Sequence, residues 1–189
     1  MCCRCYIEYL KDEELKRIYD LLNDKSDLKV EGELFPGDNV VAIANSKDMN
    51  VGVFKMKWGY SIGKRLVFNA RVESLDNKEL FMDGIKNRRC VIPVNNYFEW
   101  KKDNKEKYIF SDKESSILYL LGIYRFEESK PVLTILTKDS SEELSFIHDR
   151  MPVIIKKNDI KTWLDKSIDP KIVINKSIDN LKFMSCKTQ

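Results

Sequence analysis

The stretch RRCVIPVNNYFEWKK, residues 88–102, gives the strongest indication of the fold. Within it, apolar runs at residues 89–93 and 97–101 have the composition of β-strands, and Asn96 lies in the turn between them. Similar runs predict further short strands at residues 40–44, 51–60, 108–111, 117–126 and 132–137. Strands this short and this numerous predict a mainly antiparallel sheet.

Helices are fewer than strands in this sequence. Residues 12–25 predict an amphipathic surface helix capped by Asp12, because four apolar residues share one helical face: Leu15, Ile18, Tyr19 and Leu22. Helices are also predicted at residues 77–87, 140–147 and 159–165, the second opening on a capping box of Ser140 and Glu143. We therefore expect an α+β fold in a single domain over residues 1–189, with mainly antiparallel strands in a barrel-like sheet core and a few flanking helices.

The composition narrows the class of protein. With 189 residues, 43% of them hydrophobic and 11% aromatic, the chain can bury a sizeable core. It has no apolar run near the roughly 20 residues of a membrane span and no signal-peptide pattern at its start, so we expect a cytoplasmic protein without membrane contact. The net charge is only +3, with 33 basic and 30 acidic residues. Any nucleic-acid contact must therefore come from a local group of basic side chains.

Polar residues gather in three segments of the chain. In FNARVESL, residues 68–75, Asn69 and Arg71 would share one face of an extended segment. Glu99 stands between two aromatic residues at the end of an apolar run, and if it is partly buried its pKa should rise through desolvation. In FIHDRMPVII, residues 146–155, His148 is the only histidine of the chain and is followed by Asp149 and Arg150.

Each of these residues also has a purely structural interpretation. Asn69 could cap a turn, and Glu99 could pair with Lys101 or Lys102 at the surface. A lone histidine is often a structural residue. Cys90 lies in an apolar run and is interpreted as a small buried hydrophobe.

Cys2 directly follows Met1, so removal of Met1 would leave one residue with both a free amine and a thiol. An amine forms a reversible Schiff base with a carbonyl, and a neighbouring thiol can add to the imine carbon and close a thiazolidine ring. Both groups are partly unprotonated near neutral pH, because their ordinary pKa values are about 8 and about 8.5. Such a residue can trap an aldehyde.

The motifs stand in a fixed order: Met1-Cys2 followed by Arg4, Trp58-Gly59, Asn69-Ala70-Arg71 with Glu73, Arg88-Arg89-Cys90-Val91-Ile92-Pro93 with Tyr97-Phe98-Glu99-Trp100, and His148-Asp149-Arg150-Met151-Pro152-Val153. Together they resemble the SRAP family, the SOS-response-associated peptidase-like proteins that process abasic sites in single-stranded DNA. The resemblance spans most of the chain, and the block ending in FEW together with HDRMP is its most specific part.

The resemblance implies a DNA–protein crosslinker of the DNA damage response. Met1 is removed, and Cys2 forms a thiazolidine with the ring-opened aldehyde of an abasic site, which shields the lesion from strand cleavage. We assign catalytic roles to Cys2, Asn69, Glu99 and His148. Asn69 would orient the Cys2 amine or a sugar oxygen, Glu99 would move protons, and His148 would act on the sugar hydroxyl or on ring opening. The peptidase name fits self-removal of Met1 with Glu99 as a participant, although a separate aminopeptidase would serve equally.

The resemblance also implies contacts with single-stranded DNA. We expect Arg4, Arg71 and Arg150 to bind phosphates, with Arg88 and Arg89 as additional ligands and Glu73 as support for Arg71. Trp58 would stack on a flanking base, with core packing as the alternative. For Arg88 and Arg89 the alternative is a favourable interaction with a helix C-terminus. We expect a monomer that requires no cofactor, metal or obligatory protein partner and that associates with the nucleoid after damage.

Two other functions remain open at this point. One is a noncovalent single-strand-binding module that has lost the chemistry. The other is a thiol-redox or metal module built on the C-x-x-C of Cys2 and Cys5. The sequence argues against the second, because it has no further C-x-x-C and because residues 2 and 5 of an extended strand point to opposite faces. Cys3 stands where the SRAP family usually has glycine and Cys5 where it usually has an aromatic residue.

Overall fold

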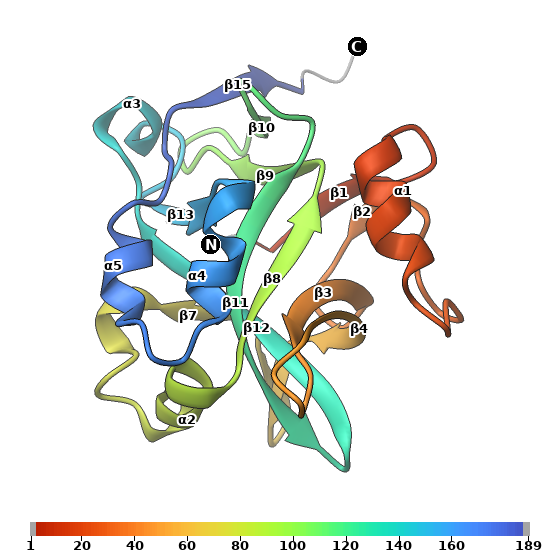
Figure 1. Ribbon diagram of the computed structural model, residues 1–189. Coiled ribbons are helices and arrows are strands. Elements are labelled where there is room, and N and C mark those ends of the chain that lie inside the picture. Colours follow the sequence, from red (N-terminus) through yellow and green to blue (C-terminus); the bar gives the residue numbers. More distant parts are fainter. Residues whose placement is uncertain (1–2, 187–189) are drawn as a thin grey trace.

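The computed structural model describes residues 3–186 and is built around a closed barrel (Figure 1). Each strand of the barrel pairs with the next, and β12 closes the ring by pairing with both β4 and β11. In ring order the strands are β12 (Lys130–Asp139), β4 (Val51–Trp58), β3 (Asn39–Asn45), β8 (Arg89–Val94) and β11 (Leu118–Glu127). The pairings are antiparallel except those that join β12 to β4 and to the short strand β7 (Asn69–Arg71).

Strands β8 and β11 bury most of their side chains because both of their faces are covered, whereas most residues of β4 are exposed or half-buried. Every residue of β8 is buried, as are the first six residues of β11. Cys90 lies within β8 and is fully buried, and this burial raises the pKa of its thiol. The interpretation of Cys90 as a small hydrophobe is confirmed.

A second, five-stranded antiparallel sheet lies beside the barrel. Its strands, in order, are β15 (Leu181–Ser185), β10 (Lys107–Asp112), β9 (Asn96–Trp100), β1 (Cys5–Glu8) and β2 (Glu31–Leu34). One face of β9 and β10 belongs to the hydrophobic core, where the rings of Tyr97 and Phe110 stack with their centroids 4.6 Å apart. The central strand β9 thereby holds the next residue on that face, Glu99, against the interior.

The remaining elements are short. The strands are β5 (Tyr60–Ile62), β6 (Arg65–Val67), β13 (Arg150–Pro152) and β14 (Ile154–Ile155), and the 3-10 helices are η1 (Val72–Ser74) and η2 (Lys157–Asp159). The α-helices are α1 (Glu13–Asp20), α2 (Glu79–Asn87), α3 (Glu142–Ser145), α4 (Ile160–Leu164) and α5 (Pro170–Ile174). Among the residues that the structure describes, no helix is long and apolar enough to cross a membrane.

The α+β fold class with its mainly antiparallel, barrel-like sheet core is confirmed. Asp12 caps α1 as predicted, since its Oδ1 accepts a hydrogen bond from the Leu15 backbone N–H at 2.9 Å. The predicted capping box of Ser140 and Glu143 is wrong. The N-cap of α3 is Ser141, whose side chain makes no capping hydrogen bond, and the helix is only four residues long.

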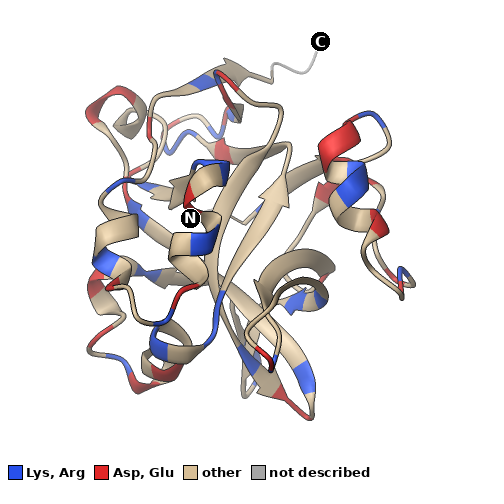
Figure 2. Cartoon of the chain, in the orientation of Figure 1, with Lys and Arg blue, Asp and Glu red and all other residues tan. Residues whose placement is uncertain are grey.

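Charges of both signs are interleaved over the surface (Figure 2). Lys and Arg residues alternate with Asp and Glu residues along the ribbon, and no face in this view carries one sign alone. This distribution agrees with the small net charge of +3. Selective binding of a polyanion would therefore depend on a few positioned side chains.

Candidate active site

Glu99 lies on the core-facing side of β9 and is only 3% exposed. In the sheet register it stands opposite Tyr108 of β10. Burial raises the pKa of Glu99 from the ordinary 4.5 to about 7. The alternative of a surface ion pair does not hold, because Glu99 is buried, Lys102 pairs with Asp149 and Lys101 lies over the Phe146 ring. The structure thus gives Glu99 the ability to exchange protons near neutral pH.

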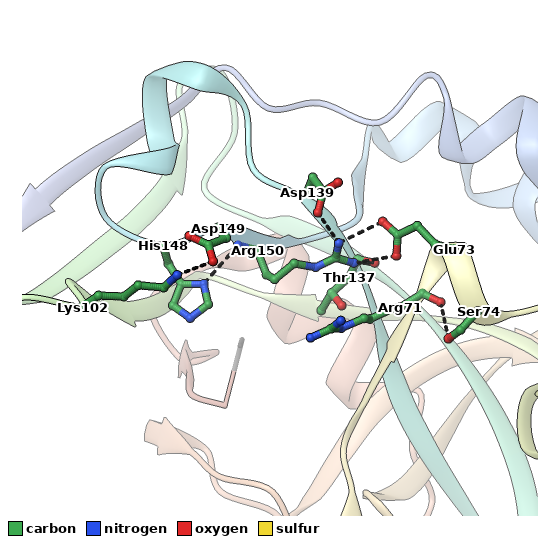
Figure 3. Close-up of polar contacts among 9 residues, drawn as sticks. All are labelled: Arg71, Glu73, Ser74, Lys102, Thr137, Asp139, His148, Asp149 and Arg150. Atoms are coloured by element: carbon green, nitrogen blue, oxygen red, sulfur yellow. Dashed lines mark hydrogen bonds and ion pairs between the residues drawn. The ribbon is translucent and has the colours of Figure 1, made fainter.

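His148 lies in the loop between α3 and β13, and its ring orientation is fixed by a backbone contact. Its Nδ1 accepts a hydrogen bond from the Arg150 backbone N–H at 3.0 Å (Figure 3). Burial lowers the pKa of His148, so the neutral imidazole is favoured at cellular pH. Because Nδ1 is an acceptor, the neutral ring carries its proton on Nε2. Nε2 is the atom through which His148 can donate a proton.

Arg150 is a buried residue that joins three segments (Figure 3). It is 8% exposed, and its Nη1 and Nη2 bind the two carboxylate oxygens of Glu73 at 2.9 and 3.0 Å. Nη1 also pairs with Asp139, and Nη2 donates to the Thr137 carbonyl at 2.7 Å. Burial opposes the charge of Arg150, but the hydrogen bonds that its guanidinium donates to these carboxylates outweigh the effect of burial and raise the pKa of Arg150.

This geometry corrects two of the sequence-based assignments. Arg150 was expected to bind phosphate, but its guanidinium is already occupied by protein carboxylates and a carbonyl. Glu73 was expected to support Arg71, but it makes its bidentate pair with Arg150. The chain turns from β7 into η1 immediately after Arg71, and this change of direction carries the Glu73 side chain to Arg150.

Asn69 and Arg71 belong to β7, which runs parallel to β12. Asn69 stands opposite Ile135 and Arg71 opposite Thr137 in the register. Ala70 between them is buried, whereas Arg71 is exposed at the end of the strand. In Figure 3 the Arg71 side chain extends toward the side of the site on which the His148 ring lies. Of Arg71 and Arg150, only Arg71 has an exposed side chain.

The N-terminal segment of the described chain runs along β9 toward Glu99. Cys5 stands opposite Tyr97, and the Arg4 carbonyl accepts a hydrogen bond from the Phe98 backbone N–H at 2.9 Å. The same register, continued by one residue, sets Cys3 opposite Glu99. Cys2, the predicted nucleophile, lies outside the described residues.

Arg4 is engaged on the outer face of the five-stranded sheet. Its guanidinium lies over the rings of Phe35 and Trp100, at 4.4 and 4.8 Å from their centroids, and pairs with Glu33 at 3.1 Å. The cation–π and ionic contacts hold the side chain against the protein. They leave about a third of it exposed, so a phosphate would share Arg4 with Glu33.

Three other predicted DNA ligands lie elsewhere. Trp58 is 1% exposed and its Nε1 donates to the Phe68 carbonyl at 2.9 Å, so core packing is the correct interpretation. Arg89 is only 5% exposed, and its Nε and Nη1 donate to the carbonyls of Ile85, Trp163, Asp165 and Ile168, so its side chain is held in the interior of the protein. Arg88 follows α2 and pairs with Asp83, and α2 lies at the end of the molecule opposite α3 in Figure 1.

Sequence reasoning missed residues that position the site. Asp139 at the end of β12 and Lys102 beyond β9 fix Arg150 and Asp149 respectively. Their partners lie 11 and 47 residues away along the chain, so neither contact leaves a local sequence pattern. Within residues 3–186, no three His, Cys, Asp or Glu side chains are grouped as metal ligands would be.

The barrel, the buried carboxyl of Glu99, the fixed ring of His148 and the order of the motifs together define a class of protein. The family model described as SOS response associated peptidase (SRAP) matches residues 1–187, and the chain belongs to this family. The chain is 34% identical over 152 residues to abasic site processing protein YoqW of Bacillus subtilis, covering 71% of this chain and 67% of that protein. It is 26% identical over 145 residues to abasic site processing protein YedK of Escherichia coli, covering 72% and 65%. The fold matches a crystal structure of a Bacteroides thetaiotaomicron protein with a TM-score of 0.78 at 20% identity, covering 98% and 92% of the two chains.

Arg150→Met should destabilise the protein by about 2 kcal/mol, because it leaves the Glu73 and Asp139 carboxylates without their cation. Urea unfolding of Arg150→Met, Glu73→Gln and the double variant measures the coupling between the two residues. Arg17→Met is the matched control, since Arg17 is exposed and pairs with Glu13 at 3.6 Å. Equal effects of Arg150→Met and Arg17→Met would contradict the structural role of Arg150.

Glu99 should make stability depend on pH. The folded state holds the Glu99 proton up to a pKa of about 7, against 4.5 for an ordinary glutamate, so folding binds a proton between these values. The free energy of unfolding therefore falls as the pH rises through this window. Glu99→Gln cannot ionise, so its stability relative to wild type should rise by on the order of 3 kcal/mol between pH 4 and pH 8.

Urea unfolding at several pH values measures this difference. Glu143→Gln, a change at an exposed position of α3, is the matched control and should not alter the pH dependence. A Glu99→Gln curve parallel to that of wild type would show that Glu99 titrates normally.

Proposed function

We propose that this protein processes abasic sites in single-stranded DNA by forming a covalent crosslink through Cys2. The observation that carries the proposal is the register that leads the N-terminal segment along β9 to Glu99, a buried carboxyl with a pKa near 7. Membership of the SRAP family and the names of the relatives support an abasic site as the lesion on which the protein acts. An N-terminal cysteine beside a proton-transfer group is what reaction with an aldehyde requires.

The reaction begins after Met1 is removed. The Cys2 amine attacks the aldehyde carbon of the ring-opened sugar, and loss of water gives an imine. The Cys2 sulfur then adds to the imine carbon, and the imine nitrogen takes up a proton as the thiazolidine ring closes. Glu99 takes a proton from the attacking amine and returns one to the departing hydroxyl. A carboxyl with a pKa of about 7 is suited to both transfers at cellular pH.

The other residues of the site bind or protonate the sugar and neutralise the phosphate. His148, with its proton on Nε2, donates to the sugar oxygen as the ring opens. Asn69 orients the amine or a sugar oxygen through its amide. Arg71 neutralises the adjacent phosphate, and Arg150 positions His148 and η1 rather than contacting DNA.

Removal of Met1 is a hydrolysis of the first peptide bond. Glu99 can activate the attacking water as a general base in its ionised form, which is the part we propose for it in self-processing. This reaction would account for the word peptidase in the family name. The processed chain would act as a monomer without a cofactor, in the cytoplasm and on damaged nucleoid DNA.

Cys2→Ala should abolish every adduct that survives denaturation, while leaving weak, salt-sensitive binding to single-stranded DNA. The measurement is intact mass and denaturing electrophoresis after incubation with an oligonucleotide containing an abasic site. Cys3→Ala is the matched control and should still form the adduct. A processed wild-type chain that binds DNA but forms no adduct would instead identify a noncovalent binding module, and retained Met1 would place the failure before the chemistry.

Glu99→Gln and His148→Ala should each slow adduct formation by about 10²- to 10⁴-fold, the usual contribution of general acid–base catalysis. The wild-type rate should rise as Glu99 ionises near pH 7, and Glu99→Gln should lose that rise. Single-turnover kinetics from pH 5 to 9 test both statements, on protein whose Met1 removal has been confirmed by mass. Glu143→Gln should react at the wild-type rate, and an unchanged rate in either site variant would remove that residue from the mechanism.

A further inference from the structure

A cluster of aromatic rings lies next to the candidate active site without a role in the chemistry. It consists of Phe146, which follows α3, Phe183 of β15 and Tyr108 of β10. Phe146 and Phe183 meet edge to face with their centroids 5.7 Å apart, and each lies 6.3 Å from the Tyr108 ring. Phe146 is nevertheless 49% exposed and Phe183 40% exposed. The three rings pack against one another, while part of the surface of Phe146 and Phe183 faces solvent.

The cluster and the reactive residues lie on the same two parts of the chain, namely the sheet that contains β9, β10 and β15 and the loop that follows α3. On the sheet, Tyr108 stands opposite Glu99, and Phe183 stands opposite Phe110 on the face that packs into the core. On the loop, Phe146 precedes His148 by two residues. In Figure 1, α3 and the β10 and β15 pair occupy the same end of the molecule. The cluster therefore continues the site outward from Glu99 and His148.

The charges around the cluster favour a nucleobase over a phosphate on the rings themselves. Glu142 and Glu143 are exposed in the first turn of α3 and would repel a phosphate. Lys101, in contrast, holds its Nζ 5.5 Å from the centre of the Phe146 ring. An aromatic surface with one cation at its border fits an unpaired base and the phosphate that follows it.

We propose that Phe146 and Phe183, supported by Tyr108, form a stacking platform for the unpaired base next to the abasic site. This inference rests on the proposed function, because it takes single-stranded DNA as the ligand. The platform holds the neighbouring nucleotide so that the lesion reaches Glu99 and His148. It recognises any base, since every base has an aromatic face.

The test measures noncovalent affinity in a Cys2→Ala background at fixed salt, by fluorescence anisotropy. The ligand is a single-stranded oligonucleotide with one tetrahydrofuran abasic analogue. Phe146→Ala should weaken binding by about 5- to 100-fold, the range for loss of one stacked base. Phe146→Trp should restore it. Phe126→Ala is the matched control, since Phe126 is 56% exposed but lies near the hairpin end of β11, at the opposite end of the barrel.

A second set of oligonucleotides locates the stacked base. Each lacks the base on one side of the analogue, either 5′ or 3′. On one of these two, Phe146→Ala should have no further effect, because the base that it contacts is already absent. An equal loss on all oligonucleotides, or no larger loss than with Phe126→Ala, would overturn the platform. A concentration-dependent dimer that Phe183→Ala abolishes would also overturn it and assign the cluster to self-association.

The outcomes separate this inference from the crosslinking proposal. Wild-type protein that forms the Cys2 adduct but shows no Phe146 effect on binding would overturn the platform alone. Protein that binds through Phe146 but forms no adduct would overturn the crosslink alone. Thermal unfolding of each variant confirms that a change in affinity is not a loss of fold.

Discussion

The geometry of the candidate site depends on one buried guanidinium. Arg150 binds Glu73 of η1 and Asp139 and Thr137 of β12, while its backbone N–H fixes the His148 ring. A cation removed from water needs such partners, and here they come from β12 and from η1, the segment that directly follows Arg71. The ion pairs hold the ends of β7, β12 and β13 in one arrangement. The loop after α3 is thereby held in place although α3 itself is only four residues long.

Whereas the ion pairs of Arg150 stabilise the fold, burial of Glu99 lowers its stability and prepares the carboxyl for proton transfer. An ionised carboxylate at a 3% exposed position is unfavourable, and its raised pKa expresses that cost. The strands around it supply enough buried apolar surface to hold it there, with Tyr97 and Phe110 stacked on the same face of the sheet. Residues that lower stability but improve reactivity are characteristic of functional sites.

The strands of the barrel were predicted well because most of their residues are apolar or β-branched, whereas the sequence left open whether Glu99 is buried or faces solvent. It predicted the arginines poorly. The local sequence around an arginine does not show whether its guanidinium faces solvent or pairs with a distant carboxylate. Arg150, for example, pairs with Glu73, which lies 77 residues away. Arg89 was misassigned for the same reason, since three of its four carbonyl partners lie in or just after α4, more than 70 residues away. Strand β15 was not predicted, because Lys182 interrupts its apolar residues and its edge position needs no continuous apolar run.

The single histidine has a practical consequence. Its Nδ1 is fixed by the Arg150 N–H, and no other imidazole exists in the chain. Every imidazole resonance in an NMR spectrum of this chain therefore comes from the His148 ring and needs no further assignment. The protein thus contains an internal spectroscopic reporter in the loop between α3 and β13, which follows the protonation of the His148 ring while a ligand enters.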